Sequence, residues 1–368
     1  MAGKARGGYL DAMRPAQPLW VGAAPALASA VLFGASTPLA KLLLGDGVDA
    51  GLLAGLLYLG SGLGLSTVLL GRQLAGATVT EAPLRRADLP WLALVVLFGG
   101  VLGPLLLMIG LTTTPASSAS LLLNVEGLAT MAIAWIVFRE NVDRRLLIGA
   151  FAILVGAVLL SWRGGPMGAG WGALAIVGAC LAWAVDNNLT RKLSSADPIQ
   201  ITAIKGVVAG TVNLLLALTR GAALPHPAAI GAAALLGLSG YGVSLALFVL
   251  ALRQLGAART GAYFSTAPFI GASLAILLFR EPITLQLLGA AALMGAGVWL
   301  HLSERHDHDH LHEALEHEHR HVHDAHHQHE HAAGDPAGEP HTHAHRHAPL
   351  RHAHPHYPDL HHRHGHAL

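Results

Sequence analysis

Histidines gather at the C-terminal end of this chain, and their spacing favours metal binding. All but one of the 25 histidines follow residue 300, many of them one residue apart, as in the run 306–310. Neutral imidazole is a common ligand of late divalent metals, and such alternation lets a flexible backbone present several ring nitrogens to one ion. We expect this region to bind divalent Ni, Zn, Co or Cu, and we expect no required cofactor. The candidate ligands are His306, His308, His310, His312, His317, His319, His321, His323, His341, His343, His345 and His347.

The histidine-rich tail, residues 303–368, is expected to be disordered. It is hydrophilic, it has almost no apolar residues for a core, and the run 334–340 is rich in glycine and proline. Three roles are open for the metal: the tail collects it for an exporter, senses it to gate a metabolite carrier, or buffers it incidentally. The ligands are too many and too mobile for an open catalytic geometry.

Glu126 is the clearest candidate for chemistry inside the membrane. It lies near the middle of the apolar run 116–138, with Asn124 close by. An ionised residue at the bilayer centre costs at least about 2.5 kcal/mol, so it should face a bundle interior or a cavity. We expect Glu126 to couple transport to a proton or cation. The alternative is a structural glutamate that is protonated or hydrogen-bonded.

Asp186 and Lys205 form a second candidate constellation. They lie at similar depths in the consecutive apolar runs 170–190 and 199–219, so they can neutralise each other. A buried ion pair can be purely structural, because removing one partner strands the other at about 3–5 kcal/mol. The alternative is a substrate or gating role in which the pair opens when a charged group enters.

Further polar residues within the apolar runs are weaker candidates. Polar groups between membrane helices are often interhelical glue worth about 0.6 kcal/mol each, and for any single asparagine this is the favoured interpretation. Lys41 is expected to extend its ammonium to the outer interface. The set comprises Asn187, Asn188 and Asn213, then Ser36, Thr37 and Lys41, and on a later run Tyr263, Ser265 and Thr266.

The elements that position these residues must be transmembrane helices. Hydrophobic residues make up 53% of the chain and charged residues 12%, against about 25% charged residues in soluble domains. A bilayer core needs about 20 apolar residues in a helix. Ten runs of this kind are found, at 20–44, 50–71, 90–110, 116–138, 146–162, 170–190, 199–219, 228–252, 257–279 and 283–302.

Basic residues predict the orientation. The N-terminus and every second connection carry thirteen Lys and Arg, whereas the alternate connections carry three: Arg163, Arg220 and Arg280. Because basic residues stay on the cytoplasmic side, both termini and the tail are predicted to be cytoplasmic, in a multi-pass protein of the cell inner (plasma) membrane.

Several classes of function are disfavoured. The net charge is +1 and the basic residues are scattered, which argues against a nucleic-acid partner. The single cysteine, Cys180, permits no disulfide within the chain. We find no nucleotide-binding loop and no nucleophile–base pair, and we expect no enzyme. Metal as the cargo is disfavoured because the expected helices offer no histidine and no cluster of carboxylates.

The two halves of the apolar body repeat each other. Residues 111–138 align without gaps onto 252–279, and 33–41 align onto 183–191. Five helices per half is an odd number, so the repeats must be inverted in the membrane. Inverted repeats are the architecture of alternating-access carriers, with the substrate site at the repeat interface.

This duplicated pattern resembles the EamA family of the drug/metabolite transporter superfamily. The resemblance rests on the early run Gly34-Ala35-Ser36-Thr37-Pro38 with Lys41, on the small residues 116–121 and on the apolar-Arg-Glu turns at 138–140 and 279–281. It covers about residues 25–302 and implies export of a metabolite. Second repeats of that family usually carry a proline, here Pro268, where the first repeat has Gly127.

The expected organisation has four parts: a cytoplasmic segment 1–19, two five-helix repeats at 20–162 and 163–302, and the tail at 303–368. We expect an all-α polytopic secondary transporter that exports a small organic solute, with a metal-binding regulatory or buffering tail. The alternatives are a divalent-metal efflux carrier that uses the tail as collector, and a membrane-anchored metal buffer or sensor. A homodimer is possible, but the spacing of Gly51 and Gly55 suits intramolecular packing equally well.

Overall fold

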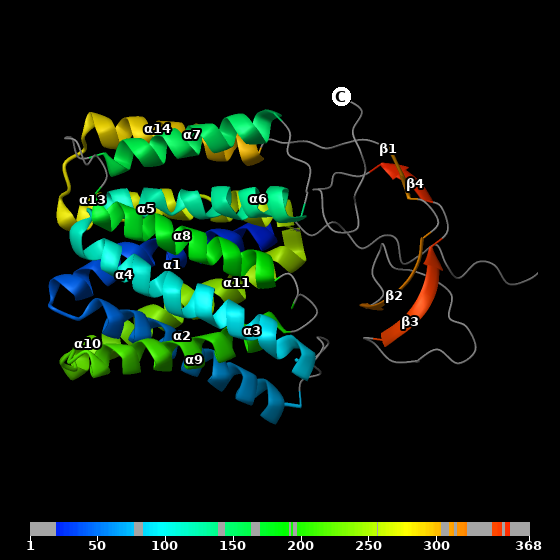
Figure 1. The fold of residues 1–368 in the computed structure, drawn as a ribbon, viewed down its shortest axis with the longest axis horizontal. Coiled ribbons are helices and arrows are strands. Elements are labelled where there is room, and N and C mark those ends of the chain that lie inside the picture. Colours follow the sequence, from blue (N-terminus) through cyan, green and yellow to red (C-terminus); the bar gives the residue numbers. More distant parts are fainter. Residues whose placement is uncertain are drawn as a thin grey trace, which may run out of the picture.

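The computed structural model describes residues 20–76, 84–138, 144–162, 170–190, 193, 197–255 and 257–302 of the body, and 309–312, 315–321, 341–347 and 350–353 of the tail. Within these residues, ten helical segments are long and apolar enough to cross a membrane. This confirms the predicted number of spans. The segments run roughly side by side in one bundle, with the connections gathered at its two ends (Figure 1).

Six spans are continuous α-helices, and the other four are interrupted. The continuous ones are α1 (Trp20–Gly45), α2 (Ala50–Leu74), α7 (Arg144–Ser161), α8 (Trp171–Thr190), α9 (Pro198–Thr219) and α14 (Leu285–Leu302). The third span follows the short helix η1 (Arg86–Asp88) and consists of α3 (Leu89–Val95), η2 (Val96–Leu102) and α4 (Gly103–Thr113); the eighth consists of α10 (Pro227–Gly237), η4 (Leu238–Val243) and α11 (Ser244–Leu255). The fourth span is α5 (Ala116–Leu122) plus α6 (Asn124–Phe138), and the ninth is α12 (Ala257–Phe264) plus α13 (Ala267–Phe279).

The interruptions follow the sequence repeat. Segments η2 and η4 are π-helical, and the alignment that places Leu111 on Leu252 also places Gly99 of η2 on Gly240 of η4. The same alignment places Leu123, between α5 and α6, on Phe264 at the end of α12. Each third helix of a repeat therefore has a π-helical turn, and each fourth helix is broken at the corresponding place.

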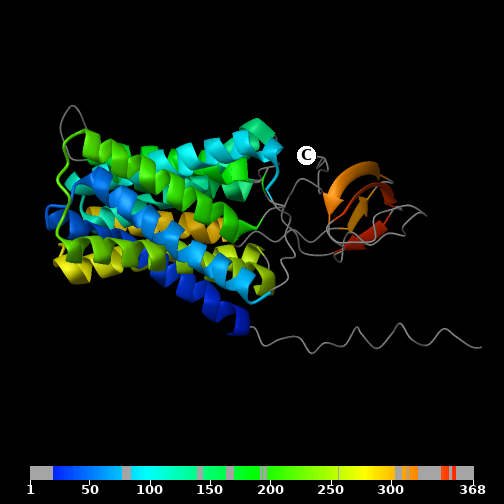
Figure 2. The same cartoon turned by 90° about the horizontal axis from the view of Figure 1, so that it is seen from below.

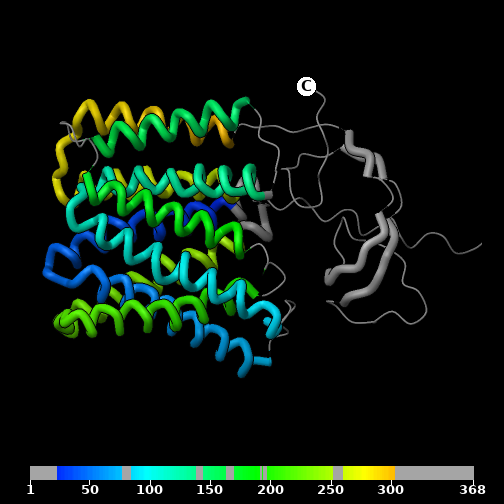
Figure 3. Tube along the Cα trace, in the orientation of Figure 1, coloured from blue at the N-terminus to red at the C-terminus, as the bar shows by residue number. Residues whose placement is uncertain are grey.

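The packing shows the inversion. Helix α1 of the first repeat lies against α11 and α13 of the second, and α8 of the second lies against α4 and α6 of the first. The pairs α2–α9 and α7–α14 join the halves and lie at opposite edges of the bundle (Figure 1). The start of α1 and the end of α14 lie at the same end of the bundle (Figures 2 and 3).

Local chemistry fixes the helix ends. The Asp49 carboxylate accepts hydrogen bonds from the amides of Gly51 and Leu52 at 2.8 and 3.0 Å, and Asp197 caps α9 through the amide of Ile199. Such caps satisfy amides that have no partner within the helix. Just beyond α9, Gly221 has a φ of 85°, a conformation that favours glycine.

Glycines allow the α2–α9 pair to pack backbone against backbone. A Cβ at Gly55 would lie 2.7 Å from the amide nitrogen of Leu214, and one at Gly206 would lie 2.6 Å from the Cα of Gly62. A Cβ at Gly51 would meet Ala217 of α9 at 3.2 Å. The Gly51 and Gly55 pair therefore serves packing within the chain.

The described stretches of the tail differ from the expected disorder. Strands β1 (Asp309–His312) and β4 (Leu350–Ala353) pair antiparallel, as do β2 (Leu315–His321) and β3 (His341–His347). The physical reason is the one-residue alternation of histidine, because period two is also the side-chain period of a strand. The predicted ligands His306, His308 and His323 lie outside the described residues.

Candidate functional site

The π-helical turn of the third span forms one wall of a polar cluster. The carbonyl of Gly99 accepts hydrogen bonds from the Tyr58 hydroxyl at 2.8 Å and from Trp183 Nε1 at 3.0 Å. Asn213 Nδ2 donates to the next two carbonyls, of Gly100 and Val101, at 3.4 and 3.3 Å. Side chains from α2, α8 and α9 thus bind carbonyls of the π-turn. Single π-helical turns within α-helices are frequent at functional sites.

Asp186 and Lys205 form the predicted ion pair beside this turn. Lys205 Nζ lies 2.7 Å from Asp186 Oδ2, with side-chain exposures of 17% and 6%. Thr190 donates to the other carboxylate oxygen at 3.2 Å. The carboxylate packs directly on Gly99, and a Cβ at that position would overlap it. The missing side chain at Gly99 therefore makes room for the ion pair.

The substitution Gly99→Ala is expected to destabilise the protein. Its Cβ would collide with a buried carboxylate, and overpacking alone costs about 1–3 kcal/mol. The control is Gly231→Ala in α10, where an added Cβ has no atom within 4 Å and alanine favours the helix. Thermal unfolding in detergent should show a lower midpoint for Gly99→Ala only. Equal midpoints for the two variants would contradict this geometry.

Glu126 joins the same cluster. It lies half-buried in the first turn of α6, where the helix dipole favours a negative charge. Its Oε1 accepts a hydrogen bond from Asn187 Nδ2 at 3.0 Å. Glu126 is also near enough to Asp186 and Lys205 to interact with both electrostatically. The two constellations singled out in the sequence thus form one group of two carboxylates and one ammonium.

Two neighbouring residues hold this group to the first repeat. Asn187 Nδ2 also lies 3.3 Å from Thr130 Oγ1, and Asn188 Nδ2 donates to the Thr130 carbonyl at 3.1 Å. Asn188 Nδ2 also bonds the Ala184 carbonyl in its own helix at 2.8 Å. Asn187 is exposed and Asn188 is buried. Asn187 therefore contacts the carboxylate, whereas Asn188 joins α8 to α6.

Aromatic rings from both repeats form a connected group that begins at Tyr58, the residue hydrogen-bonded to Gly99. The Tyr58 and Tyr241 ring centroids are 5.6 Å apart, and Phe33 lies 6.0 Å from Tyr241 and 5.2 Å from Phe264. Phe264 in turn contacts Phe248 at 4.9 Å. Sequence reasoning missed this group of rings. The sequence did hold a signal for the π-turns, although not for the rings. A glycine pair, Gly99-Gly100, lies in the middle of the third run, and glycines recur in the eighth run as Gly240 and Gly242.

The second π-turn repeats the arrangement without the charges. A Cβ at Gly240 would lie 2.8 Å from the Cβ of Ser36. Because residues 33–41 align on 183–191, Ser36 corresponds to Asp186, as Gly240 corresponds to Gly99. Ser36 bonds the carbonyl of Phe33 at 2.6 Å. The pseudo-symmetric positions thus carry a carboxylate in one half and a hydroxyl in the other.

Other predicted residues lie away from the carboxylates. Asn124 is buried, donates to the Leu121 carbonyl at 2.8 Å and lies 4.0 Å from the sulfur of Met294 in α14. Tyr263 is half-buried in α12, where its carbonyl accepts a hydrogen bond from the Thr266 hydroxyl at 2.6 Å. Ser265 bonds the carbonyl of Ala262 at 2.8 Å.

Lys41, whose ammonium was expected to extend to the outer interface, lies near the end of α1. Its ammonium donates to the carbonyls of Leu111, Thr112 and Thr114 at the end of α4. Helix C-termini present unpaired carbonyls and partial negative charge, which attract a cation. The ammonium is therefore bound within the bundle end.

Glu281 caps the neighbouring helix. Its carboxylate accepts from the amides of Ala116 and Ser117, at 2.7 and 3.1 Å, and from the Ser117 hydroxyl. The contacts of Lys41 and Glu281, which we call the end clamp, join α1 and the α13–α14 connection to the α4–α5 junction.

The described histidines of the tail lie in its strands. Among the residues that the structure describes, no group of three or more His, Cys, Asp and Glu side chains could hold a metal ion. In the β2–β3 ladder, His317 is opposite His345, His319 opposite His343 and His321 opposite His341; His347 also lies in β3, and His310 and His312 lie in β1.

One histidine does lie in a helix, contrary to the expectation that the helices hold none. His301 is in the last turn of α14, with Nε2 3.0 Å from the carbonyl of Leu146. The predicted run 283–302 already includes this residue, so the expectation overlooked it.

Ten membrane-spanning segments in two inverted repeats, with a charged cluster where the repeats meet, define a membrane transporter of the inverted-repeat class. The model of the EamA-like transporter family matches residues 20–162 and 170–303. The chain belongs to this family.

Comparisons with individual proteins also find similar chains. An uncharacterized transporter of Methanothermobacter thermautotrophicus is 33% identical over 229 residues, which are 60% of this chain and 66% of that protein. The chain thus spans slightly less than two thirds of that relative. A protein of known crystal structure, 21% identical, covers 76% of this chain and 95% of its own, with a TM-score of 0.55. The latter likeness concerns the fold alone.

Proposed function

We propose that this protein is a secondary carrier of the inner membrane that exports a small organic solute by alternating access. The observation that supports this best is the cluster of Glu126, Asp186 and Lys205 at the interface of the two repeats. Charged groups within spanning segments are expensive, and they mark substrate and ion pathways. Aromatic rings and asparagine amides complete a lining suited to an organic molecule.

The charge count supports proton coupling through Glu126. Two carboxylates face one ammonium, so the ionised cluster carries one uncompensated negative charge. A proton on Glu126 neutralises the group, and so does a cationic group of a solute. We propose that the two alternate: solute binding from the cytoplasm releases the proton, and a proton taken up from outside releases the solute.

The end clamp supports alternating access. Lys41 and Glu281 hold one end of the bundle together. In the sequence repeat, Lys41 and Glu281 correspond to Arg191 and Glu140, which lie outside the described residues. We propose that the clamp of Lys41 and Glu281 opens and closes during transport and that it faces the exterior, with both termini cytoplasmic.

Labelling of Thr114→Cys tests this gate. Thr114 is 4% exposed, its hydroxyl has no hydrogen-bond partner and its carbonyl binds Lys41. A membrane-impermeant maleimide should label it slowly in intact cells. Lys41→Gln removes charge-assisted hydrogen bonds worth about 1.5–3 kcal/mol each, which corresponds to at least about tenfold faster labelling.

Two controls accompany the labelling. Thr112→Cys is exposed and should react rapidly in either background, and the parent chain, whose only cysteine is the buried Cys180, should not react. Equal rates at Thr114→Cys with and without the Lys41 change would contradict a gate at this end.

We propose that the tail binds divalent metal and regulates the carrier or buffers the metal. Deleting 303–368 should therefore leave solute export at low metal unchanged within about twofold, and should remove any response of export to added Ni²⁺ or Zn²⁺. The check is export from inside-out vesicles over a metal titration. Loss of all export on deletion would contradict an auxiliary role.

A further inference from the structure

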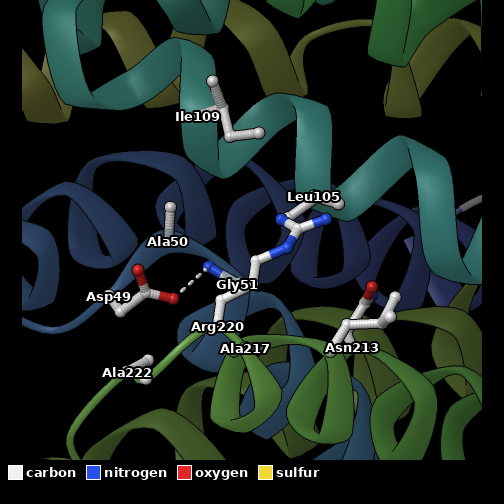
Figure 4. A pocket seen from close by; sticks show the side chains of 11 residues that line it. Asp49, Ala50, Gly51, Leu105, Ile109, Asn213, Ala217, Arg220 and Ala222 are labelled. Atoms are coloured by element: carbon white, nitrogen blue, oxygen red, sulfur yellow. Dashed lines mark hydrogen bonds between the residues drawn. The ribbon is translucent and has the colours of Figure 1, made fainter.

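A pocket at the clamp end of the bundle lies outside the charged cluster. It has a volume of about 260 Å³ and is bordered by the start of α2, by α4 and by the end of α9. Its polar lining is Asp49, Asn213 and Arg220. The side chain of Arg220 reaches across it toward Leu105, with Asn213 on the adjoining face (Figure 4).

Asn213 offers this pocket an unused acceptor. The residue is 1% exposed, and its Oδ1 has no hydrogen-bond partner. Its Nδ2 is engaged by the π-turn carbonyls of Gly100 and Val101, at 3.4 and 3.3 Å, so the amide cannot simply rotate to satisfy its oxygen. A buried acceptor without a partner is unfavourable by about 1–3 kcal/mol. A ligand N–H or O–H would satisfy it.

Arg220 offers a cation. Its side chain is exposed, and no carboxylate among the described residues lies within ion-pair distance of its guanidinium. The nearby Asp49 carboxylate accepts from the first amides of α2 through Oδ1, and it makes no ion pair with Arg220. Guanidinium groups favour carboxylate and phosphate oxygens.

The pocket adjoins the central cluster through one helical turn. The π-turn whose Gly100 and Val101 carbonyls bind Asn213 also binds Trp183 and Tyr58 through Gly99. Asn213 and Lys205 lie on the same helix, α9. The pocket and the charged cluster therefore share this π-turn.

We infer that this pocket is a second solute subsite, which takes a small molecule bearing an anionic oxygen for Arg220 and a hydrogen-bond donor for Asn213 Oδ1. The inference rests on the proposed export function, since it places the subsite on the exit path. The volume lies just below the range of about 300–1000 Å³ for drug-sized ligands, which suits a small solute. A phosphatidylethanolamine headgroup has the same chemistry, so the test must separate the two sources.

The test is protection of a pocket cysteine. Ala222→Cys, on the pocket lining, is reacted with a soluble maleimide in the full-length protein, in phosphatidylcholine nanodiscs and without any gradient. The probe is L-serine, which carries a carboxylate with hydroxyl and ammonium donors. We expect about 4 mM serine to slow labelling about fivefold, which corresponds to a Kd near 1 mM. Acetate, an anion without a donor, should protect less.

Variants assign the protection to the pocket. Arg220→Gln should abolish it and Arg220→Lys should retain part of it, while Arg280→Gln, which changes another exposed arginine at the same end, should leave it intact. Unprotected labelling rates should be equal in all variants, which shows that the pocket is still formed.

Three results would overturn the inference: no protection by serine, protection that survives Arg220→Gln, or labelling that is already blocked in phosphatidylethanolamine nanodiscs and insensitive to serine, which would assign the site to a lipid headgroup. Because no transport is measured, a chain that binds serine here but exports nothing would refute the proposed function and leave the pocket assignment standing.

Discussion

Asp186→Asn and Lys205→Met are each expected to lower the free energy of unfolding by about 3–5 kcal/mol, because each change strands a buried charge. The double variant should recover most of this stability, since no unpaired charge is left in the cluster. We expect the double variant to export nothing, because a carrier whose ion pair opens for the solute needs both charges. Thermal unfolding measures the expected loss and recovery of stability, and export in vesicles measures the expected loss of transport.

An ion pair with an exposed arginine provides the control. Arg72 lies 3.8 Å from Asp197 and its side chain is 45% exposed, while Asp197 keeps its hydrogen bond from the Ile199 amide when the arginine is removed. Arg72→Met should therefore change stability by about 0–1 kcal/mol, as is usual for exposed pairs, and should leave export unchanged. Full export by the Asp186→Asn, Lys205→Met double variant would show that the pair is structural only and would remove it from the proposed site.

Glu126→Gln is expected to abolish the dependence of export on a proton gradient. Glutamine keeps an oxygen that accepts from Asn187 Nδ2, so the fold should be retained. It cannot release a proton, however, and position 126 stays neutral. Gradient-driven accumulation should fall by at least about tenfold, the equivalent of about 1.4 kcal/mol of lost coupling, and the remaining flux should be flat between pH 6 and 8.

The control for Glu126→Gln is Asp46→Asn, which removes an exposed carboxylate outside the cluster. It should keep the pH profile of the parent chain. A Glu126→Gln protein that transports with an unchanged pH dependence would show that another group carries the proton.

The spans and the central charges could be predicted from the sequence because they depend only on which residues occur along each apolar run. A helix of about 20 apolar residues can span the membrane, whichever way it is rotated about its own axis. Asp186 and Lys205 are equally exceptional in such runs, and their similar depth on consecutive helices placed them together. The structure bears out this proximity with a 2.7 Å contact; their role in transport stays a prediction.

Features that depend on how each helix is rotated about its own axis could not be predicted from the sequence. Asn124 and Glu126 are two residues apart, yet one turns toward Met294 of α14 and the other toward Asn187 of α8. The π-turn of the third span is a second example, because its carbonyls bond side chains on three other helices. Lys41 is a third, since its partners at the end of α4 are distant in sequence.

The asymmetry of the repeats carries functional meaning in our account. Both halves place a glycine of a π-turn against the neighbouring helix, at Gly99 and Gly240, but Asp186 faces the first and Ser36 the second. Duplication of the five-helix unit thus explains why both halves have a π-turn glycine at this position. The charged side chain is present at only one of the two pseudo-symmetric positions, Asp186, and the other carries the hydroxyl of Ser36.

The most direct test of export of an organic solute is an unbiased accumulation measurement. Inside-out vesicles with the full chain, Glu126→Gln or no carrier are energised and given a filtered small-molecule cell extract with Ni²⁺, Co²⁺ and Zn²⁺, and their contents are identified by mass spectrometry. Our account predicts that one or a few organic solutes accumulate with the full chain only, and that the metals do not. Metal accumulation that weakens when residues 303–368 are deleted, with no organic solute enriched, would contradict it and make the metal the cargo.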